Sequence, residues 1–211
     1  MIDGKVSLDL MDFIEKNILP RYADFDRAHN LSHVQEVIKS SIVLAKTVGA
    51  DVDMVYTIAA YHDLGLSGPR AIHHVTGGKI MRTDVRLKRW FSPEKLKIMA
   101  EAIEDHRASA SRAPRSIYGK IVAEADRDLE ASHVFSRAVQ FGLEKYPEKN
   151  KEEQWERFLK HIKEKYSAEG YIHLWIQGSP NEVKLKEVRE IINHPTLLRK
   201  YFDRIYDEEL I

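Results

Sequence analysis

The most constraining feature of this sequence is an adjacent histidine and aspartate, His62-Asp63, at the end of an apolar helical segment. The residues before the pair are apolar at helical spacing: Val55, Ile58, Ala59 and Ala60. Burying an imidazole and a carboxylate costs several kcal/mol unless another group pairs with them. A metal ion would satisfy both side chains at once, so the fold is expected to bring further ligands to this helix end.

The composition gives no bulk argument for a charged macromolecular partner. Lys plus Arg number 33 and Asp plus Glu number 33, so the formal net charge is zero. The absence of cysteine excludes disulfides, thiolate metal sites and cysteine nucleophiles. No apolar run approaches the roughly 20 residues that span a bilayer, and Met1–Gly4 lacks the layout of a signal peptide. We therefore expect a cytoplasmic protein that binds neither membranes nor nucleic acid.

Apolar residues recur at helical spacing along nearly the whole chain, which predicts an all-α fold. The first expected helices cover about residues 6–18, 32–48, 51–64, 70–83, 93–106 and 117–129. Ser32 is expected to cap the second of them, and Ser92-Pro93 is a strong start signal for the fifth. Gly77-Gly78 lies inside the fourth, where two poor helix formers indicate a close approach by another helix or by a ligand.

Six of the ten histidines lie between residues 29 and 106: His29, His33, His62, His73, His74 and His106. Any one of them alone would be a solvated or hydrogen-bonded side chain. Their joint pattern is more informative, because His33, His62, His73 and His106 all lie near the ends of expected helices. Such ends can converge in a bundle. Asp126, which interrupts an apolar helix face, joins this set unless it forms an ion pair with a neighbouring cation.

Imidazole and carboxylate ligands together suit Mn, Fe, Co, Ni or Zn, and carboxylate with water also suits Mg. Adjacent helix residues point about 100° apart, so His62 and Asp63 cannot act as one bidentate clamp. Asp63 can instead bridge two ions while His62 holds one of them. Two metals about 4 Å apart would activate a water and clamp a phosphoryl oxygen. Asp63 is then also the residue expected to orient the attacking water.

These residues resemble the His … His-Asp … Asp signature of the HD-domain metal-dependent phosphohydrolase superfamily. The resemblance covers about residues 28–145 and includes His33 in its helix, the His62-Asp63 doublet and Asp126. It implies an all-α HD-domain helical bundle. By the same resemblance, His33, His62, Asp63 and Asp126 would hold a first metal ion.

Some members of the superfamily carry two further histidines before the last aspartate and bind two metals. His73, followed four residues later by Gly77-Gly78, resembles the first of these, and His106 resembles the second. His74 is the alternative if the register is shifted by one residue. A polar pocket around a single ion is the other interpretation of these histidines, so the number of divalent ions, one or two, stays open.

Substrate binding is expected to involve cations next to the metal ligands, because phosphate needs positive charge and donors. Three basic residues have this placement: Lys79, Arg107 and Arg112. His29 is a candidate proton donor to a leaving group, with a structural role as the alternative. Glu124 and Asp105 are candidate carboxylates for orienting the ligand imidazoles.

A charged break at Tyr146–Lys151 divides the sequence. We expect an HD-domain catalytic bundle over residues 1–145 and a C-terminal helical extension over residues 146–211, packed on the same domain. Two long amphipathic helices separated by Gly178-Ser179-Pro180 are expected in the extension, and its aromatic side chains are typical of a core. Tyr171–Trp175 is apolar enough to cover the bundle or a subunit partner, which leaves a homo-oligomer open.

The sequence therefore predicts a metal-dependent phosphohydrolase that acts on a nucleotide or similar small phosphorylated metabolite through a metal-activated water. Phosphomonoesterase, phosphodiesterase and nucleotide pyrophosphohydrolase activities all fit this prediction. One alternative is a non-catalytic metal- or nucleotide-binding regulatory protein on the same scaffold, although the complete ligand set argues against it. Another is a helical interaction protein with incidental histidines, which would contain no bound metal.

Overall fold

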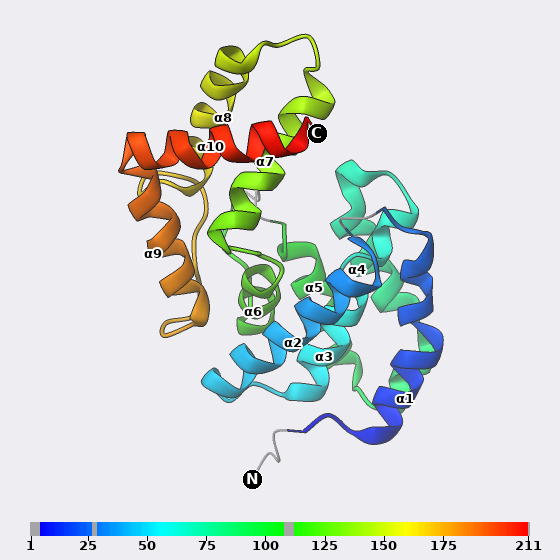
Figure 1. The fold of residues 1–211 in the computed structure, drawn as a ribbon. Helices are drawn as coiled ribbons and strands as arrows, with labels where there is room; N and C mark the ends of the chain where they lie inside the picture. Colours follow the sequence, from blue (N-terminus) through cyan, green and yellow to red (C-terminus); the bar gives the residue numbers. More distant parts are fainter. Residues whose placement is uncertain (1–4, 27–28, 108–111, 211) are drawn as a thin grey trace. The chain divides into compact units, whose positions relative to one another are not determined.

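The computed structural model describes residues 5–26, 29–107 and 112–210. Over these ranges the regular structure is α-helix with short 3-10 helices, and no β-strand occurs, which confirms the predicted all-α class. The chain divides into two compact units, Met1–Arg127 and Asp128–Ile211, which are described separately (Figure 1). Within the same described ranges, no helix is both long and apolar enough to cross a membrane.

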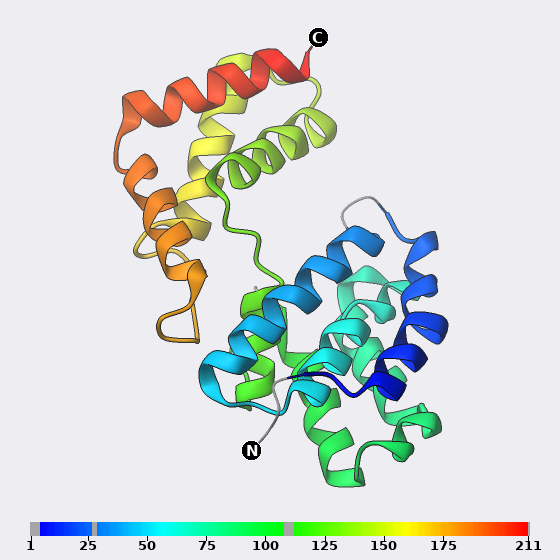
Figure 2. The same ribbon diagram turned by 60° about the horizontal axis from the view of Figure 1, so that its bottom comes forward.

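The N-terminal unit is a bundle of α-helices joined by short 3-10 segments. Its α-helices are α1 (Leu8–Asn17), α2 (Leu31–Val48), α3 (Val52–Tyr61), α4 (His73–Thr83), α5 (Pro93–Asp105) and α6 (Ile117–Ala125). Its 3-10 helices are η1 (Leu19–Asp24), η3 (Leu64–Ser67), η4 (Arg70–Ile72) and η5 (Val85–Arg89). Helix α3 is buried along almost its whole length, and α2, α5 and α6 pack against it (Figure 2). The end of α3 therefore lies where several helices meet.

Local signals explain where these helices begin and end. The Asn30 side chain caps α2 by accepting a hydrogen bond from the His33 backbone N–H, so the expected cap at Ser32 is wrong. Asn30 has the extended backbone of a cap, whereas Ser32 already lies inside the first turn. Ser92 and Pro93 begin α5 as predicted. The helix expected over 117–129 ends early, with Asp126 as its C-cap.

Glycines allow α4 to lie directly against the end of α3 and against α5. A Cβ atom on Gly65 would overlap the His73 carbonyl oxygen and would lie 2.6 Å from the Gly77 nitrogen. A Cβ atom on Gly77 would lie 2.9 Å from Ile103 Cγ2. The close approach by another helix that was predicted for Gly77-Gly78 is therefore confirmed.

The C-terminal unit contains α7 (Ala131–Lys145), α8 (Lys151–Tyr166), α9 (Pro180–Ile192) and α10 (Pro195–Glu209). Its core is aromatic: Phe135, Phe158 and Phe202 are fully buried, and Trp155 stacks on Phe158. Tyr171, which was expected in the core with the other aromatics, is exposed. The single helix expected after Gly178-Ser179-Pro180 is two helices, because Pro195 begins a new one.

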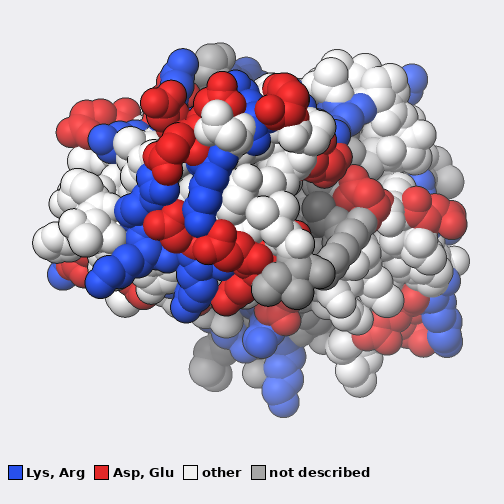
Figure 3. All heavy atoms as spheres, turned by 45° about the horizontal axis from the view of Figure 1, so that its top comes forward, with Lys and Arg blue, Asp and Glu red and all other residues white. Residues whose placement is uncertain are grey.

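The division between the two units falls before α7, whereas the sequence placed it at residues 145/146. Helix α7 belongs with the C-terminal helices because the Phe135 ring contacts the rings of Phe158 in α8 and Tyr201 in α10. The expected packing of the extension on the bundle stays a prediction. On the face drawn in Figure 3, basic and acidic side chains are interspersed, as the zero formal net charge leads one to expect.

Candidate metal centre

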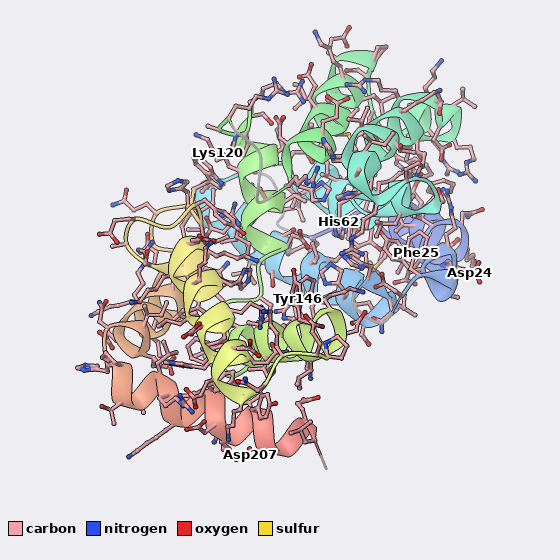
Figure 4. The ribbon with its side chains drawn as sticks, turned by 90° about the horizontal axis from the view of Figure 1, so that it is seen from above. Asp24, Phe25, His62, Lys120, Tyr146 and Asp207 are labelled. Carbon is pink, nitrogen blue, oxygen red and sulfur yellow. The ribbon has the colours of Figure 1, made fainter. Side chains whose placement is uncertain are left out.

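The six side chains expected as metal ligands meet inside the N-terminal unit: His33, His62, Asp63, His73, His106 and Asp126. Three of them are C-cap residues, since His62 ends α3, His106 ends α5 and Asp126 ends α6. His62 lies among the helices of this unit in Figure 4. The C-terminal end of a helix carries partial negative charge, so the convergence of three such ends favours a cation.

The cluster is closed on one side and open on the other. His62 is fully buried, and Asp63 and His106 are almost fully buried. The side chains of His33, Asp126 and His73 keep 24%, 27% and 14% of their surface exposed. Among the described residues of the cluster, these three side chains are the ones that solvent reaches most easily.

The Asp63 carboxylate lies between two groups of imidazoles. Its Oδ2 atom is 3.2 Å from His62 Nε2 and 3.7 Å from His33 Nε2. Its Oδ1 atom is 3.7 Å from both His73 Nε2 and His106 Nε2. Two sets of possible ligands thus share Asp63, and within each set the ligand atoms lie within 4.8 Å of one another. Asp63 could therefore contribute a ligand atom to either set.

Asp126 completes the first set. Its Oδ1 atom lies 3.1 Å from His33 Nε2 and 3.6 Å from His62 Nε2. Neither imidazole nitrogen has a hydrogen-bond partner among the described residues, although both are buried. At 3.1 Å the Asp126 oxygen is within hydrogen-bond distance of His33 Nε2, and these atoms are of the kinds that could ligate a cation.

Backbone carbonyls orient the imidazoles of His62, His73 and His106. Each carbonyl belongs to the third residue before its histidine. His62 Nδ1 lies 2.7 Å from the Ala59 oxygen, and His106 Nδ1 lies 2.6 Å from the Ile103 oxygen. His73 Nδ1 lies 2.8 Å from the Arg70 oxygen. A carbonyl oxygen can only accept, so Nδ1 must carry the hydrogen. In a neutral ring the lone pair is then on Nε2, the atom that faces the cluster.

With this tautomer, a cation would relieve a repulsion between two of the rings. His73 Nε2 lies 3.2 Å from His106 Nε2, so two neutral rings would direct their lone pairs at each other. Buried acceptors without a donor are costly. A divalent ion beside Nε2 would relieve this contact, and imidazole with carboxylate is a donor set that such ions accept. The residues therefore fit a divalent metal.

The charges inside the cluster are strongly coupled. Burial lowers the pKa of His62, but the negative charges of Asp63 and Asp126 outweigh burial and raise it well above its ordinary value. Burial likewise acts to raise the pKa of Asp63, and the contacts with His62 and His106 reverse this and hold it well below the usual range. Both pKa shifts favour an ionised Asp63 carboxylate. They also favour positive charge, rather than a bare lone pair, at His62 Nε2.

Residues 30–130 match the HD domain family, a range that contains all six clustered residues. This chain is an HD-domain protein. HD domains define a superfamily of metal-dependent phosphohydrolases, and the histidine and aspartate cluster of this one is compatible with divalent metal binding. Comparisons with curated proteins and with solved structures gave no match.

The structure places His73, and not His74, in the second of the two sets. The Nε2 atom of His73 faces Asp63 and His106, as described above. His74 belongs to neither set, and its buried Nδ1 atom has no hydrogen-bond partner in the described part of the chain. Burial lowers the pKa of both rings.

The three expected phosphate-binding cations do not contact the cluster in the described structure. Arg107 donates to the Ala71 carbonyl at 2.9 Å, and Arg112 donates to Asp105 at 3.3 Å. Lys79 is exposed on α4, six residues after His73, and six residues place the two side chains about 120° apart around a helix. Their roles in phosphate binding stay predictions.

The expected orienting role of Asp105 is wrong. Its buried carboxylate accepts hydrogen bonds from Arg115, at 2.8 Å from the backbone N–H and at 2.9 Å and 3.1 Å from Nε. It thereby holds Arg115 onto α5, while main-chain carbonyls orient the imidazoles. Glu124 is fully buried. The last carbonyls of a helix lack an intrahelical partner, so a histidine at a helix end was the signal for this arrangement.

A group of side chains beside the candidate metal centre consists of Asp26, His29 and Arg70. The sequence pattern did not indicate a role for Arg70. His29 Nδ1 lies 2.6 Å from Asp26 Oδ1, and the Arg70 guanidinium lies 3.2 Å from Asp26 and 3.4 Å from His29 Nε2. The His29 ring contacts the His33 ring, with centroids 5.9 Å apart. His29 was expected near the centre, but Arg70 had no distinguishing sequence signal.

Proposed function

We propose that this HD-domain protein is a metal-dependent phosphohydrolase that hydrolyses a nucleotide or a similar small phosphorylated metabolite. The observation that carries the proposal is the pair of ligand sets that share Asp63. A divalent ion bound there supplies positive charge at the phosphoryl group and acidifies water. A cytoplasmic location and self-association stay predictions.

Each ligand has a distinct task in this proposal. His33, His62 and Asp126 would hold one ion, while His73 and His106 would hold a second. Asp63 contributes one oxygen to each set, so it fixes the spacing between them. The same carboxylate orients the attacking water toward phosphorus. The phosphoryl group enters on the open side, where His33, Asp126 and His73 are partly exposed.

His29 is proposed as the proton donor to the leaving group. Asp26 accepts a hydrogen bond from its Nδ1 atom, which orients the ring and leaves Nε2 as the nitrogen that can pass on a proton. The ring lies beside His33 and keeps little exposure, with 17% of its side-chain surface accessible. It is therefore close to the reacting group without being one of the metal ligands.

A paired substitution tests the proposal. His62→Ala with Asp63→Ala is expected to abolish bound metal, measured by elemental analysis, and hydrolysis across a metal-supplemented panel of nucleotides, dinucleotides and phosphomonoesters. Both partners are buried, so the isosteric Asp63→Asn is a second variant that keeps the shape and removes the charge. Circular dichroism checks that helicity is kept. Release of pyrophosphate, as against phosphate, identifies the type of bond cleaved.

The chain offers a matched control in the C-terminal unit. His133 and Asp128 form an exposed pair, with His133 Nδ1 at 2.9 Å from Asp128 Oδ2. His133→Ala with Asp128→Ala removes the same two side-chain types and is expected to leave metal content and hydrolysis unchanged. Persistent hydrolysis in a folded Asp63→Asn protein would contradict the proposed site. A wild-type protein that binds no metal would contradict the proposed function.

A further inference from the structure

The Arg70 side chain lies at the open side of the metal centre and is lightly held. It keeps 68% of its surface exposed, and its partner Asp26 keeps 57%. Exposed ion pairs of this kind contribute little net free energy. The guanidinium can therefore leave Asp26 for another anion at small cost.

Arg70 is tied to both halves of the centre. Its backbone carbonyl accepts the hydrogen bond from His73 Nδ1, so the main chain of Arg70 is part of one ligand set. Its side chain reaches back to His29, whose ring contacts His33 of the other set. The guanidinium thus lies beside the centre, separated from the nearest ligand by one imidazole ring.

This separation limits which anionic group of a bound substrate Arg70 can contact. A phosphoryl group held by the metal ligands would be centred on Asp63, Asp126 and the Nε2 atoms. Arg70 is one ring further out, so an anion on its guanidinium is a different group of the same molecule. Arginine suits this task because its planar fork binds phosphate or carboxylate through two parallel hydrogen bonds.

Of three further arginines near the centre, Arg115 is the one that several protein groups hold. Arg115 donates to Asp105 and to Glu104, at 2.7 Å, and also to the Glu101 carbonyl. Arg112 and Arg107 donate to Asp105 and to the Ala71 carbonyl. The contacts of Arg115 anchor the chain to α5, so its release would disturb the helix that carries His106. Among the described contacts of Arg70, release would break an exposed pair and a long contact with His29.

We propose that Arg70 binds a second, non-reacting anionic group of the substrate, and that Asp26 and His29 hold its side chain in place when no anion is bound. This inference rests on the proposed function, and it narrows the substrate to phosphoryl compounds with a further phosphate or carboxylate. Arg70 is then a specificity-determining residue rather than a catalytic one.

The test compares two probes that cannot be hydrolysed. Methylenediphosphonate carries two anionic groups, and methylphosphonate carries one. Their affinities for the manganese-loaded protein are measured by isothermal titration calorimetry. Arg70→Gln is expected to weaken diphosphonate binding by about tenfold or more, the effect of losing a hydrogen bond to a charged group. Methylphosphonate binding is expected to change by less than about twofold, because this ligand does not reach Arg70.

Arg89→Gln is a closely matched control. Arg89 is 69% exposed and forms an ion pair with Asp9 at 3.3 Å, where Asp9 is 53% exposed. It is expected to leave both affinities unchanged. Arg70→Lys keeps the charge but loses the fork, so intermediate diphosphonate binding is expected. Manganese content is expected to stay the same in all variants, because the carbonyl that holds His73 belongs to the main chain.

Three results would overturn the inference. They are no diphosphonate binding by the metal-loaded wild type, equal losses for both probes in Arg70→Gln, or an equal loss in Arg89→Gln. These results concern ligand binding alone. Failure of the proposed function would appear instead as absent metal or absent hydrolysis by the wild type.

Discussion

The two units of this chain bury different chemistry. The N-terminal unit encloses ionisable side chains: His62, Asp63, Asp105, His106 and Glu124. The C-terminal unit encloses aromatic rings and keeps its ions at the surface, where Arg199 pairs with Glu152 and Asp203. Its buried Gln154 is neutral and donates to the Gly142 and Tyr146 carbonyls.

The interior of the N-terminal unit contains the side chains of a candidate binding site, whereas the interior of the C-terminal unit is a packed aromatic core. Buried charges cost free energy unless a partner compensates them, so the stability of the N-terminal unit is expected to depend on ionisation and to increase when a cation binds. Buried aromatic rings contribute stability directly through their area. The C-terminal unit is therefore expected to be indifferent to metal, whereas the N-terminal unit is not.

The largest expected effect on stability is in the aromatic core. Phe158→Ala removes a fully buried ring and is expected to lower the free energy of unfolding by about 3–5 kcal/mol, as for other large core truncations. Urea unfolding measures the loss, and segment-resolved hydrogen exchange assigns it to residues 128–211. Phe141→Ala, at a 51% exposed ring in the same unit, is expected to cost less than about 1 kcal/mol.

The metal content of the Phe158→Ala protein tests whether the C-terminal core is independent of metal binding. Phe158→Ala is expected to leave the metal stoichiometry of the folded protein unchanged, because every proposed ligand lies in the N-terminal unit. A variant that remains folded but loses its metal would break the comparison, since the C-terminal core would then support the centre.

A smaller effect is expected where backbone contact sets the geometry of the centre. Gly65→Ala places a Cβ atom against the His73 carbonyl and is expected to cost about 1–3 kcal/mol, as for other overpacked sites. Gly178→Ala in the C-terminal unit meets no atom within 4 Å. Its φ of +74° should still cost about 1 kcal/mol through strain. Thermal unfolding compares the two, and calorimetric metal titration adds a second readout.

Only the first of these glycine substitutions is expected to weaken metal binding, because α4 must shift and carry His73 with it. An undiminished metal affinity in Gly65→Ala would show that the second ligand set tolerates displacement of α4. The idea that main-chain contact fixes the spacing of the two sets would then fail.

The last expected effect is a pH dependence that Tyr56 gives to the N-terminal unit. Burial, followed by the charge of Glu15, raises the pKa of Tyr56 from 10.0 to about 12. A folded-state pKa above the unfolded value means that Tyr56 stabilises the fold fully below pH 10. This contribution is lost as the pH rises toward about 12. Tyr56→Phe is expected to flatten this decline in the free energy of unfolding, measured by urea titration from pH 9 to 12. Equal slopes would contradict the assignment.

The convergence of the six candidate ligands could be predicted because polar residues at helix ends stand out against apolar periodicity. His33, His73, His106 and Asp126 each interrupt or terminate such a pattern, and the fold brings them to the His62-Asp63 pair. The cations could not be placed in the same way. Long basic side chains choose partners that only tertiary structure provides, so Arg107 and Arg112 bind Ala71 and Asp105 while Arg70 lies beside His29.

Competing local signals limited how accurately the helix boundaries could be predicted from the sequence. Asn30 and Ser32 are both good caps, and only the backbone geometry at Asn30 decides between them. Pro195 was a usable signal for a new helix, but the apolar stripe that continues to Leu197 hid it. The division before α7 depends on ring contacts between distant residues, which periodicity within one helix does not report.

The main-chain carbonyls that orient His62, His73 and His106 have a consequence for how this protein can evolve. An orienting side chain can be lost by a single codon change, whereas a carbonyl is present whatever residue occupies positions 59, 70 and 103. The tautomers of these imidazoles therefore depend on the path of the backbone and not on which side chains occupy those positions. Residues around the open side can drift and alter which molecules are accepted while the ligand geometry persists.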